Sequence, residues 1–386
     1  MHYDLIIVGG GLVGASLALS LRSLKWRIAL IEATSARSDD PRLFGLTASS
    51  CQFLKNLNLW QQLADYATPI HQVHVSYQGC FGAIRLHHTD VHVPQLGYVI
   101  PARYIEAALH AELILKSNVD YYCKATVQAL QQANLIALTV QTDVGEKLLQ
   151  SPIVIAADGA ESTIRKQLNI ETEIIDYQQS AIVTQTFLQR SHHYIAYERL
   201  NARGAIAMLP LLDNKCATIF TADHATITQF MALSDEAFVA LLQKEFGYRL
   251  GRFEKIAKRY VFPLKMVQAK ENIRQGVLLL GNAAHALHPI AAQGFNLALY
   301  EVAILSDAIR SKVIAGQLFS QIDLEKAMHY THRQRSFSIF TSHQLAQLSK
   351  YHSPLLNMCL SLGMVGLDNI KPMKEFFIHK MIGMAS

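Results

Sequence analysis

A glycine-rich turn near the N-terminus constrains the fold of this chain more than any other feature. Residues 3–8 are apolar enough to form a buried strand, and residues 12–24 carry apolar side chains at helical spacing. Between them Gly9, Gly11 and Gly14 form a Gly-x-Gly-x-x-Gly pattern. In such a turn the first glycine permits a tight bend, the second lets a phosphate approach the backbone, and the third lets the helix lie close to the strand. The N–H groups at the helix start then favour an anionic ligand.

The residues that follow this turn predict a dinucleotide site. Residues 27–31 form a second predicted strand, which ends at Glu32, 18 residues after Gly14. A carboxylate at this point accepts hydrogen bonds from ribose hydroxyls, and it disfavours the 2′-phosphate of NADP. FAD and NAD both remain compatible with the motif. The predicted ligand contacts in this segment are Gly9, Gly11, Leu12, Val13, Gly14 and Glu32.

Two later loops also follow short apolar strands. One strand leads into Asp158-Gly159, and another leads into Gly281-Asn282. The second loop contains two histidines and a proline before a helix that opens with Gln293-Gly-Phe-Asn296. A glycine-bearing loop in front of a helix can stabilise partial negative charge, which in a flavin site would lie on the reduced ring.

Composition narrows the class of protein. Lys and Arg number 35 against 30 Asp and Glu, for a net charge of +5 without blocks of like charge, which argues against nucleic-acid binding. The five cysteines include no Cys-x-x-Cys pair, which argues against a disulfide framework and a cysteine zinc site. The scattered histidines lack carboxylate partners, so we expect no metal. We expect no signal peptide and no membrane-spanning helix, and we expect the protein in the cytoplasm.

The three motifs in this order resemble the group A flavoprotein aromatic hydroxylases, which share the p-hydroxybenzoate hydroxylase-like fold. Within that group the chain is similar to the ubiquinone-biosynthesis hydroxylases. The similarity includes the segment around Arg42, Ala196-Tyr-Glu-Arg199 and Gln293-Gly-Phe-Asn296, and it extends over essentially the whole chain. Gly281-Asn282 and Leu287-His-Pro-Ile-Ala291 resemble 2-polyprenyl-6-methoxyphenol hydroxylase more than its sister enzymes.

This resemblance implies an α/β fold with three parts. A Rossmann-like FAD-binding domain is interrupted by a mixed β-sheet domain that binds the substrate, and a helical C-terminus follows. Apolar strand patterns at the start, middle and late chain favour the same division. The expected boundaries are 1–70, 99–175 and 270–322 for the FAD-binding domain, 71–98 and 176–269 for the substrate-binding sheet domain, and 323–386 for the C-terminal helical region.

The resemblance also implies FAD contacts beyond the first turn. Pro101-Ala102 departs from the acidic residue and amide that are usual in the group, which weakens the assignment of Arg103, and Tyr300-Glu301 replaces a common Arg-Asp. Asn282 stands where Asp is usual and keeps both a donor and an acceptor. The implied contacts are Arg42, Arg103, Asp158, Gly281, Asn282, Gln293, Gly294, Phe295 and Asn296. His288 and Pro289 are the catalytic candidates near the flavin ring. The alternative is that His288 is an ordinary loop histidine without a catalytic role.

The activity implied by the resemblance is hydroxylation of a polyprenyl-phenol intermediate of ubiquinone biosynthesis. It would use FAD, O2 and transiently bound NAD(P)H, through a C4a-hydroperoxyflavin. Two alternatives remain open: a flavin-dependent isoprenoid reductase, and a non-catalytic subunit of a ubiquinone-biosynthesis complex. The apolar tail from Pro354 to Ser386 either packs on the body or contacts the inner face of the cytoplasmic membrane as a peripheral helix.

Overall fold

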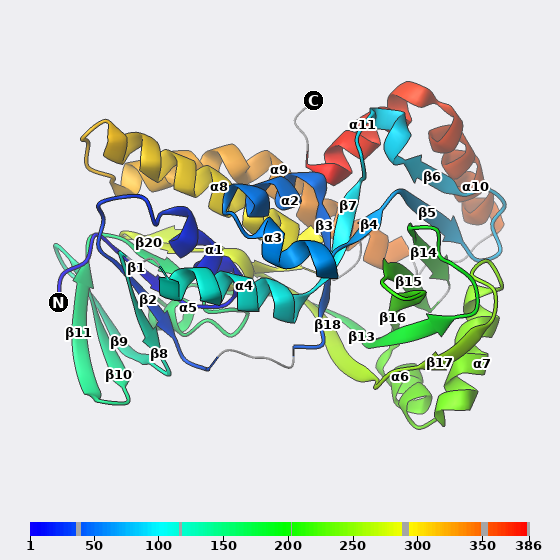
Figure 1. Ribbon diagram of the computed structural model, residues 1–386, viewed down its shortest axis with the longest axis horizontal. Helices are drawn as coiled ribbons and strands as arrows, with labels where there is room; N and C mark the ends of the chain where they lie inside the picture. The colour runs from blue at the N-terminus through cyan, green and yellow to red at the C-terminus, as the bar shows by residue number, and fades with distance from the viewer. Residues whose placement is uncertain (36–39, 116–117, 202, 288–292, 349–353, 384–386) are drawn as a thin grey trace.

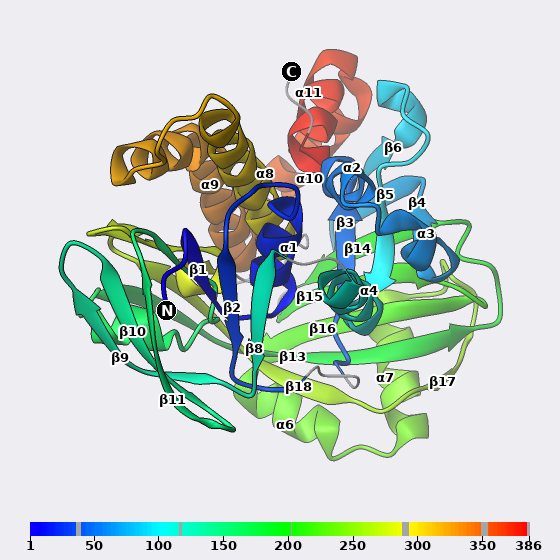
Figure 2. The same cartoon turned by 60° about the vertical axis from the view of Figure 1, so that its left-hand side comes forward.

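The computed structural model describes residues 1–35, 40–115, 118–201, 203–287, 293–348 and 354–383. Two large sheets organise it, one in each half of the molecule, and helices from distant parts of the sequence cover them (Figures 1 and 2). The expected α/β fold class is confirmed.

The first sheet has six strands and contains the glycine turn. Its order is β19-β20-β12-β1-β2-β8, and its strands run parallel except for the antiparallel pair β19–β20. The inner strands β1, β2, β12 and β20 are apolar because both faces of the sheet are buried there. Their bounds are β1 (Leu5–Val8), β2 (Ile28–Glu32), β8 (Val119–Cys123), β12 (Val154–Ala156), β19 (Ile273–Arg274) and β20 (Val277–Leu279).

Helices cover one face of this sheet, and a small antiparallel sheet covers the other. The helices are α1 (Leu12–Ser20), α4 (Ala102–Leu115), α8 (Gln293–Ile314) and α9 (Gln321–Leu348), which share one core with Leu5, Ile7 and Leu30. The opposite core contains Ile6 and Val8. It is closed by β9 (Thr126–Gln132), β10 (Ile136–Thr142) and β11 (Gly145–Ser151), while α5 (Thr163–Gln167) contacts β9.

The second sheet has nine strands and forms the other half of the molecule. Its order is β21-β18-β13-β16-β15-β14-β5-β6, with β17 paired to β13. Helices α6 (His224–Met231) and α7 (Asp235–Phe246) cover its outer face. The strands are β5 (Gln72–Tyr77), β6 (Ile84–His87), β13 (Thr172–Leu188), β14 (Ile195–Asn201), β15 (Gly204–Leu211), β16 (Lys215–Asp223), β17 (Phe253–Ile256), β18 (Tyr260–Ala269) and β21 (His285–Ala286).

A fourth sheet, of three strands, lies between the two halves. It has the order β3-β7-β4, formed by β3 (Leu43–Thr47), β4 (Thr68–Ile70) and β7 (Gly97–Pro101). The sequence of residues 49–66 predicts a helix, but these residues do not form a single one. The chain forms α2 (Ala48–Asn56), α3 (Trp60–Leu63) and the 3₁₀ turn η1 (Ala64–Tyr66). Asn58 interrupts the helix because its φ of 63° is left-handed.

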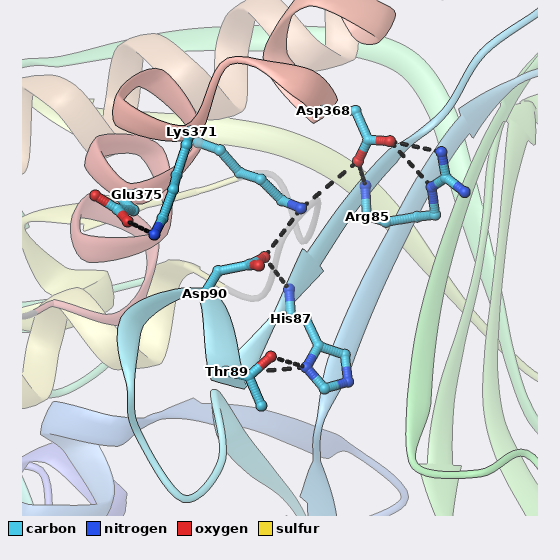
Figure 3. Close-up of polar contacts among 8 residues, drawn as sticks. Arg85, His87, Thr89, Asp90, Asp368, Lys371 and Glu375 are labelled. Atoms are coloured by element: carbon cyan, nitrogen blue, oxygen red, sulfur yellow. Dashed lines mark hydrogen bonds and ion pairs between the residues drawn. The ribbon is translucent and has the colours of Figure 1, made fainter.

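The C-terminal helices α10 (Pro354–Asn369) and α11 (Lys371–Ile382) lie against the edge of the nine-stranded sheet. An ionic network holds them to β6 and to the 3₁₀ turn η2 (His88–Val91). Arg85 donates to Asp368 from its backbone N–H at 2.8 Å and from Nη2 at 2.6 Å (Figure 3). Lys374 lies 3.0 Å from Asp90. In the part of the chain that the structure describes, no helix is long and apolar enough to span a membrane.

Candidate active site

The glycine turn between β1 and α1 leaves no room for side chains at two positions. A Cβ atom at Gly9 would overlap the Ala157 carbonyl, and a Cβ atom at Gly14 would overlap the Gly9 carbonyl. Gly9 also has a left-handed φ of +101°. Gly11 differs, because it caps α1 and a Cβ atom there would meet nothing within 4 Å. The backbone itself therefore requires Gly9 and Gly14, whereas Gly11 opens onto empty space.

A cavity of about 400 Å³ begins at this turn, lined by residues 9–12 and by Glu32 at the end of β2. The Glu32 carboxylate is fixed beside the turn. It accepts from the Gly10 N–H at 2.7 Å, and from the Thr34 N–H at 2.8 Å and hydroxyl at 2.7 Å. Because carboxylate oxygens have further lone pairs, Glu32 can still accept hydrogen bonds from a ligand in the cavity. The Glu32 carboxylate therefore lies beside the glycine turn, where the spacing predicts it.

A larger cavity of about 760 Å³ continues from the first. Both cavities are lined by Gly11, Leu12, Arg42, Ala157 and Gly159, so they form one elongated space. The larger part is enclosed by the inner face of the nine-stranded sheet, the start of α8 and the inner face of α11. An extended ligand that binds at the glycine turn would therefore reach the space between the two large sheets.

Asp158 lies where the two cavities meet the end of β12. Its Oδ2 accepts from the Ile164 N–H at 3.2 Å. Its Oδ1 is buried and has no hydrogen-bond partner among the described residues. A buried carboxylate oxygen without a donor is unfavourable, so this atom would gain from a ligand hydroxyl or N–H group.

The two arginines assigned to the cofactor site differ in position. Arg42 lines both cavities, and its Nε donates to Asp40 at 2.9 Å. Arg103 lines neither cavity. It is exposed on α4, with its guanidinium 4.7 Å from the centre of the Tyr104 ring. Glu106 and His110, which are four residues apart on α4, line the smaller cavity instead.

The loop after β20 brings most of its predicted residues to the larger cavity. Gly281 packs under the Val13 side chain with a left-handed φ of +60°, and Asn282 lines the cavity. At the start of α8, Asn296 Nδ2 donates to the Gly45 carbonyl at 2.8 Å, and its Oδ1 accepts from the Thr47 N–H at 2.9 Å. Asn296 thus joins α8 to β3.

The neighbours of Asn296 are also engaged with protein groups. The Phe295 ring lies 4.7 Å from the Phe44 ring. The Gln293 Oε1 accepts from the Thr341 hydroxyl at 3.2 Å. Gly294 also lines the cavity. The two catalytic candidates, His288 and Pro289, lie outside the described residues.

A buried ionic triad beside this loop could not be predicted from the motifs. His285 Nε2 lies 3.1 Å from Glu301 on α8, and Arg335 on α9 donates to the same carboxylate at 2.7 Å. Glu301 is 1% exposed. Burial opposes ionisation, but His285 and Arg335 outweigh it and hold the pKa of Glu301 below its usual value. The triad therefore ties the 281–287 loop to two helices, and it gives a structural role to the unusual Glu301.

These features fit a flavin dinucleotide. Gly11 leaves the space that a pyrophosphate needs, and the end of β2 supplies a ribose acceptor. Asp158 supplies an unpartnered acceptor further along the same space. The second, largely apolar cavity suits a planar ring together with an apolar substrate.

Comparison with protein families gives the same result. Residues 2–317 match the family described as "FAD binding domain". This chain belongs to that family. The match contains the glycine turn, the Asp158 loop and the loop after β20, and it identifies FAD as the cofactor.

Curated relatives of this family member match it over nearly its whole length. Ubiquinone hydroxylase UbiL of Rhodospirillum rubrum is 26% identical, covering 98% of this chain and 89% of that protein. The 3-demethoxyubiquinol 3-hydroxylase of Escherichia coli is 24% identical, covering 99% and 98%. Ubiquinone biosynthesis monooxygenase COQ6 of Drosophila melanogaster is 25% identical, covering 99% and 90%.

Solved structures share the fold. The p-nitrophenol 4-monooxygenase PnpA of Pseudomonas putida superposes with a TM-score of 0.81 at 17% identity, covering 99% of both chains. The aromatic hydroxylase CabE from angucycline biosynthesis superposes with a TM-score of 0.73 at 18% identity, covering 99% of this chain and 76% of CabE.

Proposed function

We propose that this protein is an FAD-dependent monooxygenase that hydroxylates a polyprenyl-phenol intermediate of ubiquinone biosynthesis, using NAD(P)H and O2. The observation that carries the proposal is that the cavity at the glycine turn continues into a larger cavity of about 760 Å³ with apolar walls. The names of the relatives, ubiquinone hydroxylases and COQ6, support the substrate class. The Gly281-Asn282 and Leu287-His-Pro-Ile-Ala291 segments of the sequence support 2-polyprenyl-6-methoxyphenol hydroxylase as the finer assignment.

The residues of the chain would position the flavin and the phenol, and they would exclude water from the cavity. When bound, FAD supplies the redox chemistry with O2. Gly11 and the start of α1 would bind the pyrophosphate, and Glu32 would bind a ribose. Asp158 and Asn282 would hold polar groups nearer the ring. The apolar faces of the nine-stranded sheet and α11 would hold the phenol ring and its tail in a site that excludes water.

Turnover with labelled oxygen tests this function. The purified protein would be supplied with FAD, NADH or NADPH, ¹⁸O2 and 2-farnesylphenol. We expect oxidation of the nicotinamide that depends on the phenol, and one ¹⁸O atom in the product. Nicotinamide oxidation without ¹⁸O incorporation would indicate a reductase instead. A protein that takes up no FAD and consumes no reductant would favour the non-catalytic subunit.

Contact with a membrane surface is a second part of the proposal. The inner face of α11 packs on the body through Ile378 and Ile382, but apolar side chains on the outer faces of α10 and α11 remain exposed. Lys371 lies among them, with its side chain 76% exposed and its Nζ 3.7 Å from Glu375. An exposed apolar helical face on a chain of net charge +5 is suited to anionic lipid. The exposed apolar residues are Met358, Leu362, Ile370, Met373 and Phe376.

Liposome flotation tests this contact without disturbing the core. Cutting the chain before Pro354 would remove Ile378 and Ile382 from the core, so surface substitutions are preferable. We expect the double variant Met373→Glu with Phe376→Glu to lose flotation with phosphatidylglycerol vesicles. The matched control, Val144→Glu with Leu148→Glu, changes two exposed apolar residues on β10–β11 and should float as the wild type does. Equal flotation of both variants would discard the membrane contact, and a protein complex would then be the better partner.

A further inference from the structure

The inner face of the nine-stranded sheet carries one acidic side chain into the larger cavity. Along β14, Ala196, Glu198 and Leu200 share the face that lines the cavity. Tyr197 and Arg199 alternate with them and contact α7 on the outer face. The carboxyl group of Glu198 therefore belongs to the wall of the proposed substrate site.

The surroundings of Glu198 are apolar. The strands on either side place Val75 of β5 and Ala207 of β15 directly opposite it. Thr221 of β16 also lines the cavity, but its hydroxyl accepts from the Ala205 N–H at 2.7 Å. Among the described residues that line this cavity, Glu198 is the only carboxylic acid.

Within the described part of the chain, the Glu198 carboxyl group has no hydrogen bond and no ion pair, and burial raises its pKa to about 7. Two other carboxylates near the site are already paired, Asp40 with Arg42 and Glu301 with His285 and Arg335. A carboxyl group that faces an apolar cavity without a donor is unfavourable, unless the ligand supplies the donor.

We infer that Glu198 is the substrate-binding residue that accepts a hydrogen bond from the phenol hydroxyl of the substrate. This inference rests on the proposed function, and it adds the group that recognises the ring. A hydroxyl-bearing ring satisfies the carboxylate, whereas the corresponding methyl ether leaves it buried without a partner. Sites built in this way reject the analogue that lacks the donor. Glu198 would also draw the phenol proton toward itself and so increase electron density on the ring.

The titratable groups around Glu198 determine how recognition of the phenol hydroxyl should depend on pH. Tyr77, which lies beyond Val75 on β5, has a hydroxyl whose pKa is raised by burial. Across the cavity, α11 contributes Phe377 and Met381, which do not titrate, and Arg42 is paired with Asp40. Glu198 is therefore the group that changes charge near neutral pH. It accepts best above its pKa of about 7, so discrimination for the phenol should fall as the pH is lowered through that value.

Ligand binding to the FAD-loaded protein tests the inference. The probes are 2-farnesylphenol and its methyl ether, and their Kd values are measured from perturbation of the flavin absorption band. We expect the wild type to bind the phenol roughly ten- to hundredfold more tightly than the ether at pH 8. Glu198→Leu should reduce this ratio to near one while still binding the ether. Glu198→Gln should keep part of the ratio but lose its dependence on pH.

Two controls separate the possible failures. Glu173→Gln changes an exposed carboxylate on β13 of the same sheet and should keep the wild-type ratio. FAD content of the Glu198 variants should match the wild type and their unfolding midpoint should not fall, because the Glu198 carboxyl group contacts no other described side chain by a polar bond. Full FAD content with an unchanged phenol-to-ether ratio in Glu198→Leu would overturn the inference and leave the proposed function standing. A wild type that binds FAD but neither probe would instead count against the proposed function.

Discussion

Replacing Gly14 by alanine should prevent the first βαβ unit from closing. The added Cβ atom would overlap the Gly9 carbonyl oxygen, and backbone atoms on both sides cannot move without separating α1 from β1. We expect a loss of roughly 3 kcal/mol or more in the free energy of unfolding, at the upper end of the cost of overpacking. The purified protein should be colourless or insoluble. Thermal or urea unfolding together with the visible absorption spectrum measures both effects.

Gly11→Ala is the matched variant, because it separates folding from cofactor binding. Gly11 has an ordinary φ of −68°, and a Cβ atom there meets nothing within 4 Å. Alanine at this cap should cost less than about 1 kcal/mol of stability. It should nevertheless weaken FAD binding roughly ten- to hundredfold, because the methyl group displaces the pyrophosphate from its N–H donors. Wild-type FAD affinity in Gly11→Ala would show that the pyrophosphate does not bind at this turn.

Replacing Glu301 by alanine should produce the second large effect. The change leaves Arg335 and His285 without their shared partner in a buried position, where Glu301 is only 1% exposed. Breaking a buried ion pair by removing one partner costs about 3–5 kcal/mol. We expect the urea midpoint of the protein to fall sharply. The loop from Gly281 should also become more susceptible to proteolysis, because the triad anchors it to α8 and α9.

The pH dependence and two controls test the cause of this effect. The folded-state pKa of Glu301 is lowered, so its contribution to stability is present above the unfolded pKa and is lost as the pH falls. The gap between wild type and Glu301→Ala should therefore narrow in acid. Glu171→Ala removes an exposed ion pair with Lys270 and should leave the midpoint unchanged. Replacing Glu301 by Leu and Arg335 by Met together should recover part of the lost stability. An unchanged midpoint in Glu301→Ala would contradict the anchoring role.

Local sequence was sufficient to predict which residues lie together at the glycine turn. The turn from Gly9 to Gly14 and Glu32 depend on residues close in sequence, and the structure places them together as expected. The Asp158 loop was also predictable, because parallel strands end at the same edge of a sheet. The separate helices at 48–56 and 60–63 were missed because one left-handed residue, Asn58, changes the chain direction without altering the apolar pattern.

Features that depend on distant pairing could not be predicted in the same way. The triad joins residues from β21, α8 and α9, and Glu301 stood out in the sequence only as a departure from the family pattern. β5 pairs in parallel with β14, more than a hundred residues later, and this pairing places Val75 beside Glu198. The residues of α4 that face the cofactor cavity are Glu106 and His110 rather than Arg103, because the rotation of the helix decides which side faces inward.

A structure of this protein determined with bound FAD tests the central claim most directly. We expect one dinucleotide in the joined cavities. Its adenosine ribose should lie at Glu32, its pyrophosphate at Gly11 and the start of α1, and its ring end in the larger cavity beyond Asp158. A dinucleotide bound elsewhere, or a protein that takes up no FAD at saturating concentration, would contradict it.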